Sequence, residues 1–275
     1  MQPPAAIRRE TAYAKINLAL HVRARRADGY HEIETIFAFA DDGDALSLVP
    51  NGGPGLTITG PFAAGLSAGD DNLVLRAAAA LGRSDASLVL DKRLPIAAGI
   101  GGGSADAAAA LRLLLRGETE ALLGEIAAGL GADVPACLHA QTARAEGLGY
   151  PVEAITASGL TGMPLLLVNP RVPCPTGPVF AGWDGVDRGP LAQGDPLAAA
   201  IAGRNDLDPP ARRLLPVIGA VLALLAAQPG VRLSRMSGSG ATCFALFDDP
   251  RAQAAAAAAV RAAQPGWWSL ETRLR

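Results

Sequence analysis

The chain has 275 residues, of which half are hydrophobic and 18% are charged, and its formal net charge is −2. This length suits one large domain or two modest ones with ample core, and the composition excludes an intrinsically disordered chain. Because the charge is close to neutral, nothing electrostatic favours nucleic acid or an acidic membrane as a partner, and we expect neither.

The cysteines and the apolar runs bear on the cellular compartment. Three cysteines lie without metal-ligand spacing, and an odd number favours reduced thiols in a cytosol. The longest apolar run, at 217–227, is too short to span a bilayer. No apolar stretch follows the charged residues 8–10, so no signal peptide is indicated. We expect a cytoplasmic protein.

Two strands joined by a turn are predicted first. Residues 11–22 alternate with a period of two, which places Lys15 and Asn17 on one face of a strand. Asp28-Gly29 is a hairpin signal, and residues 30–39 form the returning strand. Lys15 is one of only two lysines, so it and Asn17 are candidates to address one ligand, although a lone lysine on a strand is usually just solvated.

Residues 94–109, with the sequence LPIAAGIGGGSADAAA, join a predicted strand at 87–90 to a predicted helix at 105–115. Glycines let the backbone approach a ligand closely, and Ser104 stands where an N-cap is expected. Free N–H groups at a helix N-terminus form an anion site, most often for phosphate. A plain tight turn is the alternative. The loop is no Walker A motif, because no Gly-Lys-Ser/Thr follows, and it is a poor dinucleotide fingerprint.

The remaining elements are predicted from hydrophobic periodicity and from the residues that typically begin or end helices and strands. Strands are predicted at 44–49, 56–59 and 165–168, and helices at 73–81, 118–130, 209–227 and 251–263. Asn72 is a predicted cap of the helix after it, and Asp133 is a candidate cap for a short helix with Pro135 in its first turn. Residues 169–180 form a proline-rich loop, 184–195 a polar mobile segment, and 231–247 two strands around a glycine loop.

Several of these segments together resemble one enzyme superfamily. The loop that starts at Pro95 resembles the second GHMP kinase motif, with Ile100 in place of Leu and Ala105 in place of the second Ser. The segment 13–39, YAKINLALHVRARRADGYHEIETIFAF, resembles the opening of the 4-diphosphocytidyl-2-C-methyl-D-erythritol kinases, the cytidine-specific branch. Gly-Ala-Asp-Val-Pro at 131–135 matches another element of that family, and the resemblance extends from residue 13 to residue 247.

The resemblance implies an α+β fold of two GHMP kinase domains, with a boundary between residues 157 and 158 and the active site in the cleft between the domains. The implied reaction is transfer of phosphate from ATP to the 2-hydroxyl of 4-diphosphocytidyl-2-C-methyl-D-erythritol, in the non-mevalonate route to isoprenoid precursors. The expected partner is thus a small cytidine diphosphate compound. Magnesium is expected to arrive with ATP, no protein metal site is expected, and the chain is expected to be a monomer or weak homodimer.

The family's functional residues carry over by position. Lys15 and Asp133 are the implied catalytic residues, with Asp133 as the base. The implied ATP-binding residues are Asn72, Lys92, Pro95, Ala97, Ala98, Gly99, Ile100, Gly101, Gly102, Gly103 and Ser104. The implied substrate-binding residues are Asn17, Tyr30, His31, Thr176, Phe180, Gly238 and Ser239, with Tyr30 and Phe180 stacking on cytosine.

Two alternatives remain open from the sequence. Another GHMP kinase, acting on homoserine or a mevalonate compound, would share the glycine loop, but Tyr30-His31 argues against it. A non-catalytic nucleotide-binding member of the fold would be expected to lack Lys15 or Asp133, and both are present.

Overall fold

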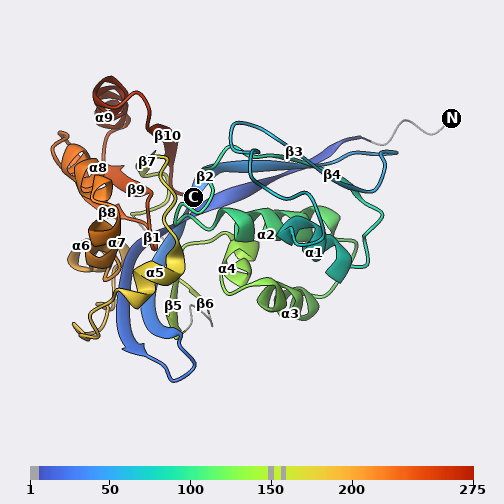
Figure 1. The fold of residues 1–275 in the computed structure, drawn as a ribbon, viewed down its shortest axis with the longest axis horizontal. Helices are drawn as coiled ribbons and strands as arrows, with labels where there is room; N and C mark the ends of the chain where they lie inside the picture. Colours follow the sequence, from blue (N-terminus) through green and yellow to red (C-terminus); the bar gives the residue numbers. More distant parts are fainter. Residues whose placement is uncertain (1–5, 148–151, 156–158) are drawn as a thin grey trace. The chain divides into compact units, whose positions relative to one another are not determined.

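The computed structural model describes residues 6–147, 152–155 and 159–275 (Figure 1). The chain forms two compact units, each made of separate segments. Unit 1 comprises Met1–Ala14, Asp42–Ile96 and Gly101–Ala140, and unit 2 comprises Lys15–Asp41, Ala97–Ile100 and Gln141–Arg275. Two long strands, β1 (Arg8–Arg25) and β2 (His31–Leu48), contribute residues to both units.

Unit 1 combines part of a β-sheet with four helices. Its strands are β3 (Gly55–Thr59) and β4 (Ser87–Asp91), which pair in parallel, and the end of β2, which pairs antiparallel with β4. Its helices are α1 (Leu73–Ala80), α2 (Gly102–Leu114), α3 (Glu120–Leu130) and α4 (Val134–His139). The alanines of α2 are buried, and α1, α3 and α4 all pack against it. Small side chains there allow the close approach that places α2 at the centre of the unit.

The strands that lie wholly in unit 2 are β5 (Ala143–Gly147), β6 (Val152–Ala154), β7 (Pro164–Asn169), β8 (Val231–Met236), β9 (Cys243–Phe247) and β10 (Trp268–Arg273). The last four form an antiparallel sheet in the order β10-β7-β9-β8. The helices of unit 2 are α5 (Thr176–Ala181), α6 (Pro196–Ala202), α7 (Asp208–Leu214), α8 (Val217–Ala226) and α9 (Pro250–Ala263). Helices α8 and α9 pack side by side on the four-stranded sheet (Figure 1). Apolar residues of these helices and strands share one core with Leu20 and Val22 of β1.

Several sequence predictions are confirmed and others are wrong for local reasons. The helix predicted at 209–227 is two helices, α7 and α8, separated at Pro216, which has no N–H to continue the first helix. The strand predicted at 44–49 is the continuation of β2 rather than a separate element. The proline-rich loop ends in helix α5, and α6 and β10 were not predicted. The two strands at 231–247, the helix at 251–263 and the strand at 165–168 are confirmed.

The predicted boundary between residues 157 and 158 lies outside the described residues, so it stays a prediction. Among the residues that the structure describes, no helix is both long and apolar enough to cross a membrane. The three cysteines are free and buried.

Candidate active site

The first half of the glycine loop is held by backbone contacts inside unit 2. Gly99 has φ +74°, and a Cβ added there would lie 2.4 Å from the carbonyl oxygen of Ser237. The Ser237 hydroxyl donates to the Gly99 carbonyl at 2.9 Å, and the Thr242 N–H donates to the Ala98 carbonyl at 3.1 Å. Only glycine fits such a conformation and such a close approach. The glycine loop at 237–242 therefore packs against the loop at 97–100.

Strand β1 joins the same group of loops. The Lys15 N–H donates to the Ile100 carbonyl at 3.0 Å, and the Asn17 N–H donates to the Ser237 hydroxyl at 3.1 Å. Both predicted ligand-facing side chains are buried, with Lys15 6% and Asn17 5% exposed, so the interpretation of Lys15 as an ordinary solvated residue is wrong. The Lys15 ammonium lies over the ring of Phe37, 5.4 Å from its centroid. Asn17 is thus brought to the glycine loops together with Lys15.

The second half of the loop begins helix α2 in unit 1. The N-cap is Gly101, which adopts a left-handed conformation at φ +63°, and the helix starts at Gly102. The prediction of Ser104 as N-cap is therefore wrong, because Ser104 already lies within the first helical turn. The first-turn N–H groups of Gly102, Gly103 and Ser104 have no acceptor inside the helix, and the macrodipole adds partial positive charge. This is the geometry of an anion site.

The other predicted ATP-binding residues of unit 1 have clear local roles. The Asn72 side chain caps α1 by accepting from the Val74 N–H at 2.9 Å, as predicted, and it also donates to the Ser67 carbonyl at 2.7 Å. The Lys92 ammonium lies 2.5 Å from a carboxylate oxygen of Asp44 and 2.6 Å from one of Asp106. The side chain of Lys92 is thus engaged inside unit 1, and its contact with ATP stays a prediction.

Asp133 stands at the N-cap position of α4, but its side chain does not cap the helix. Its backbone is helical, at φ −88° and ψ −14°, and no capping hydrogen bond is made by the carboxylate. A proline in the first turn follows as expected. Asp133 therefore stands at the predicted cap position, but its carboxylate does not cap the helix.

Three aromatic rings and an arginine gather at the proposed cytidine end, all within unit 2. The ring centroid of His31 lies 5.1 Å from that of Phe180 and 5.8 Å from that of Trp183. Arg25 donates to His31 Nε2 at 3.3 Å and to the Ala181 carbonyl at 3.2 Å. Arg25 is exposed at the end of β1, and these two contacts connect its guanidinium to His31 and to α5. Trp183 was not predicted, although it follows α5 closely in a chain with only 4% aromatic residues.

The protonation state of His31 follows from these contacts. Burial, followed by the neighbouring Arg25 guanidinium, lowers the pKa of His31 below its usual value. The ring is then neutral at pH 7, and because Nε2 accepts from Arg25, the proton lies on Nδ1. His31 thus offers a donor rather than an acceptor.

The remaining predicted substrate residues occupy the loops around α5. Tyr30 is 65% exposed in the turn before β2, and its stacking on cytosine stays a prediction. The hydroxyl groups of Thr176 and Ser239 lie 3.0 Å apart. Gly238 has φ +53° and its carbonyl accepts from the Asn205 amide at 2.8 Å. Helix α5 and the glycine loop at 237–242 are therefore in contact.

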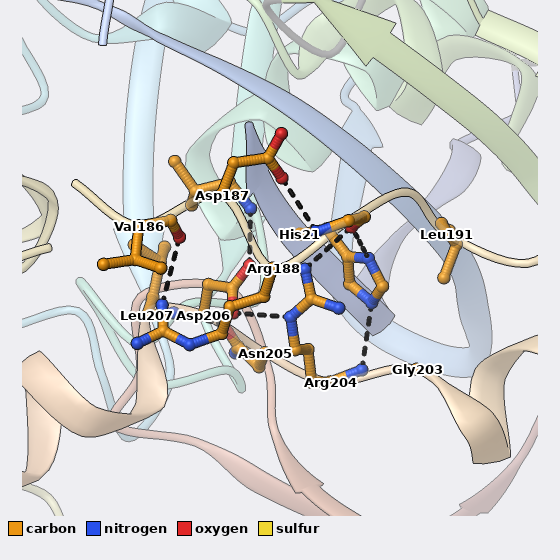
Figure 2. Close-up of polar contacts among 12 residues, drawn as sticks. His21, Val186, Asp187, Arg188, Leu191, Gly203, Arg204, Asn205, Asp206 and Leu207 are labelled. Carbon is orange, nitrogen blue, oxygen red and sulfur yellow. Dashed lines mark hydrogen bonds and ion pairs between the residues drawn. The ribbon is translucent and has the colours of Figure 1, made fainter. Parts of the chain in front are cut away.

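The segment at 184–195 was predicted to be mobile, but its first part, 184–191, is held by polar contacts. The Gly189 carbonyl lies 3.2 Å from Nδ1 of His21. On the other side of the ring, Nε2 accepts from the Arg204 N–H at 3.2 Å (Figure 2). Asp187 pairs with Arg23 at 2.9 Å. Burial, followed by the Arg204 charge, lowers the pKa of His21. A neutral His21 with its proton on Nδ1 satisfies both contacts.

Among the described residues, no group of three or more histidine, cysteine, aspartate and glutamate side chains is placed to hold a metal ion.

Comparison with known proteins identifies the family. The GHMP kinase N-terminal domain matches residues 72–141, and the GHMP kinase C-terminal domain matches residues 191–266. A 4-diphosphocytidyl-2-C-methyl-D-erythritol kinase of Rhizorhabdus wittichii is 61% identical, over 97% of this chain and 94% of the relative. One of Sphingopyxis alaskensis is 53% identical, over 98% of this chain and 99% of the relative.

Solved structures agree with this relationship. A crystal structure of 4-(cytidine 5'-diphospho)-2C-methyl-D-erythritol kinase superposes with a TM-score of 0.79 at 35% identity, covering 97% of this chain and 99% of the other. A homoserine kinase from Cytophaga hutchinsonii, at 16% identity and a TM-score of 0.68, covers 100% of this chain and 96% of the other, and it shares the fold alone. With its α+β fold of GHMP kinase N- and C-terminal domains, the chain belongs to the 4-diphosphocytidyl-2-C-methyl-D-erythritol kinase family.

Proposed function

We propose that the protein transfers the γ-phosphoryl group of ATP to the 2-hydroxyl of 4-diphosphocytidyl-2-C-methyl-D-erythritol, in the non-mevalonate route to isoprenoid precursors. The observation that carries this proposal is the glycine loop at the start of α2, together with relatives named for this reaction at up to 61% identity along nearly the whole chain. Three free, buried cysteines fit the reducing cytoplasm in which we place the enzyme.

The ATP end of the site uses backbone groups. The first-turn N–H groups at Gly102 to Ser104 bind phosphate oxygens, and the macrodipole of α2 stabilises their charge. Gly99 and Gly101 hold the backbone conformations that this requires. Magnesium, brought by ATP, supplies further neutralisation of phosphate charge. Phosphoryl transfer demands mainly positioning and charge stabilisation, which suits such a site.

The acceptor end uses two side chains. The carboxylate of Asp133 takes the proton of the substrate 2-hydroxyl as its oxygen attacks the γ-phosphorus. The bond from this phosphorus to the β–γ bridging oxygen breaks, and ADP leaves with the electron pair. The ammonium of Lys15 stabilises the developing charge on the attacking oxygen. These roles rest on the family match at each position.

The cytidine end gives specificity. Stacking on Tyr30 and Phe180 tolerates any base, so hydrogen bonds to the base edge must discriminate. The Nδ1–H of His31 is a donor, and cytosine presents an acceptor at ring nitrogen 3 where uracil presents an N–H. His31 therefore favours cytidine over uridine.

The experiment that tests the function is turnover of purified protein with ATP and 4-diphosphocytidyl-2-C-methyl-D-erythritol, followed by ADP release and by phosphorus NMR of the product. Parallel reactions contain homoserine or mevalonate as acceptors. Product with the cytidine compound alone supports the proposal. Product with another acceptor would assign a different GHMP kinase, and ATP binding without any turnover would indicate a non-catalytic member.

A further inference from the structure

A buried cluster of three charged residues lies behind the glycine loop in unit 1. It consists of Lys92 between Asp44 and Asp106, with ammonium-to-carboxylate distances of 2.5 Å and 2.6 Å. The side chains are 3%, 0% and 6% exposed, respectively. Buried charges destabilise a fold unless opposite charges neutralise them. The net charge of this cluster therefore bears on both stability and function.

The cluster connects three elements at the point where the glycine loop enters α2. Asp44 belongs to β2, and its Oδ1 accepts from the Arg93 N–H at 2.6 Å and the Leu94 N–H at 2.8 Å, at the start of the loop. Asp106 belongs to α2, just after the first turn. A Cβ added at Gly102 would lie 3.2 Å from the Lys92 ammonium nitrogen, so this nitrogen lies against the loop backbone.

The charges do not balance when both carboxyl groups are ionised. One ammonium and two carboxylates then leave a net charge of −1 behind a loop whose N–H groups are expected to bind phosphate. Both oxygens of Asp44 are occupied by donors. Asp106 Oδ1 is buried and has no hydrogen-bond partner among the described residues. Asp106 is therefore the carboxyl group with room for a proton.

Two further observations agree with this assignment. Burial raises the pKa of Asp106 to about 7, with the nearby Asp44 carboxylate acting in the same direction and Lys92 against it. Burial lowers the pKa of Lys92, but the Asp106 and Asp44 carboxylates outweigh burial and raise it, so Lys92 stays charged. A single proton on Asp106 makes the cluster neutral near physiological pH.

The other charged groups on the surrounding elements are directed elsewhere. In the helices packed on α2, these side chains are exposed: Arg76, Glu120, Glu125 and His139. Arg112 of α2 itself pairs with Glu10 at 3.0 Å, and Asp91 of β4 pairs with Arg93 at 2.7 Å. Asp133, half-buried, precedes α4. Lys92 and Asp44 are the charged groups that act on the Asp106 carboxyl.

We propose that Asp106 is a positioning residue that takes up a proton when nucleotide phosphates bind at the glycine loop, so that a neutral Asp44–Lys92–Asp106 cluster supports the loop. This inference rests on the proposed function, in which that loop binds ATP. In the ionised state the cluster repels an incoming phosphate through a medium of low dielectric constant, and protonation removes the repulsion. Asp106 acts through Lys92 and does not touch the nucleotide.

The test compares ATP binding by the parent protein and by Asp106→Asn from pH 6 to pH 9. The amide keeps the shape and an oxygen for Lys92 but fixes the neutral state. In the parent, the Kd for ATP should rise above pH 7 by up to about tenfold per pH unit relative to the variant, the limit for one linked proton. The titration of ATP itself is common to both proteins. Asp85→Asn, an exposed site in unit 1, is the matched control and should follow the parent.

Calorimetry at pH 8 in buffers of different ionisation enthalpy measures, on the parent protein alone, how many protons are taken up when ATP binds. Proton uptake beyond that of ATP supports the inference, and its absence overturns it even if Asp106→Asn does not fold. Equal pH dependence of Kd in parent and Asp106→Asn also overturns it, while leaving the proposed function intact. A parent protein that binds no ATP at any pH would overturn the proposed function and this inference with it.

Discussion

At the scale of single residues, the proposed role of Asp133 is in catalysis rather than in capping helix α4. Its carboxylate makes no capping hydrogen bond to α4, and Asp133→Asn keeps the size and shape of the side chain, so the melting temperature should change little. Asp133→Asn should lower turnover by roughly 10²–10⁴, the range for a positioned acid–base group. Melting temperature and steady-state kinetics, measured together, check this. Asp195→Asn is the control, because Asp195 does cap its helix and the amide retains the capping oxygen. Near-parental turnover of Asp133→Asn would remove Asp133 from the catalytic residues.

His31 and Tyr30 make different contributions to the choice of base. Tyr30→Ala removes an exposed ring that is proposed to stack on the base. It should therefore weaken the binding of cytidine and uridine analogues alike, by roughly 1–3 kcal/mol. His31→Ala removes the Nδ1–H donor, so it should weaken the binding of the cytidine analogue more than that of the uridine analogue. Calorimetric Kd values for both analogues check the two patterns. If both variants bind the cytidine compound as tightly as the parent, the base must bind elsewhere.

At the scale of elements, the glycines of the phosphate loop fall into two classes. A Cβ at Gly99 would lie 2.4 Å from a backbone carbonyl, whereas one at Gly103 meets nothing closer than Leu73 Cδ1 at 3.7 Å. Gly99→Ala should therefore destabilise the fold, while Gly103→Ala should leave stability unchanged or raise it by up to about 1 kcal/mol through helix propensity. Gly103→Ala should nevertheless weaken ATP binding, because its methyl group stands among the proposed phosphate donors.

Thermal unfolding and ATP calorimetry on the two variants distinguish these effects. Gly102→Ala is a poorer probe, because its methyl group would press on Lys92 at 3.2 Å. If Gly103→Ala binds ATP as the parent does, the first turn of α2 is not the phosphate site.

The elements that the sequence predicted well are those with a local cause. The strand at 11–22, the Asn72 cap and the end of the helix predicted at 118–130 depend on neighbours along the chain, and the structure has them. The buried cluster behind the loop could not be predicted, because Asp44 and Lys92 are 48 residues apart and no local pattern links them. Trp183 and the fixed segment at 184–191 likewise depend on contacts with β1 and β2. Motif matching named the candidate site residues, whose roles stay predictions, and it could not name the contacts that hold them in place.

At the scale of the whole molecule, the buried histidine in β1 links stability to pH. Burial, and then the charge of Arg204, lowers the pKa of His21, so the unfolded chain takes up a proton more readily than the folded one. His21 therefore contributes stability that is complete above its unfolded pKa of about 6.5 and is lost as pH falls below that value towards the folded pKa. His31, whose pKa is also lowered, acts in the same direction.

The free energy of unfolding should therefore fall between pH 7 and pH 5, and part of this fall should disappear in His21→Gln. The glutamine amide can still donate to the Gly189 carbonyl or accept from the Arg204 N–H, but it does not titrate. His139→Gln, on an exposed histidine at the end of α4, should retain the parental pH dependence. Urea denaturation at both pH values measures the difference. Equal losses in the parent and His21→Gln would mean that the contacts of His21 tolerate its protonation. The segment at 184–191 would then have to be held mainly by the Asp187–Arg23 pair and by Glu34, which accepts from the Leu191 N–H.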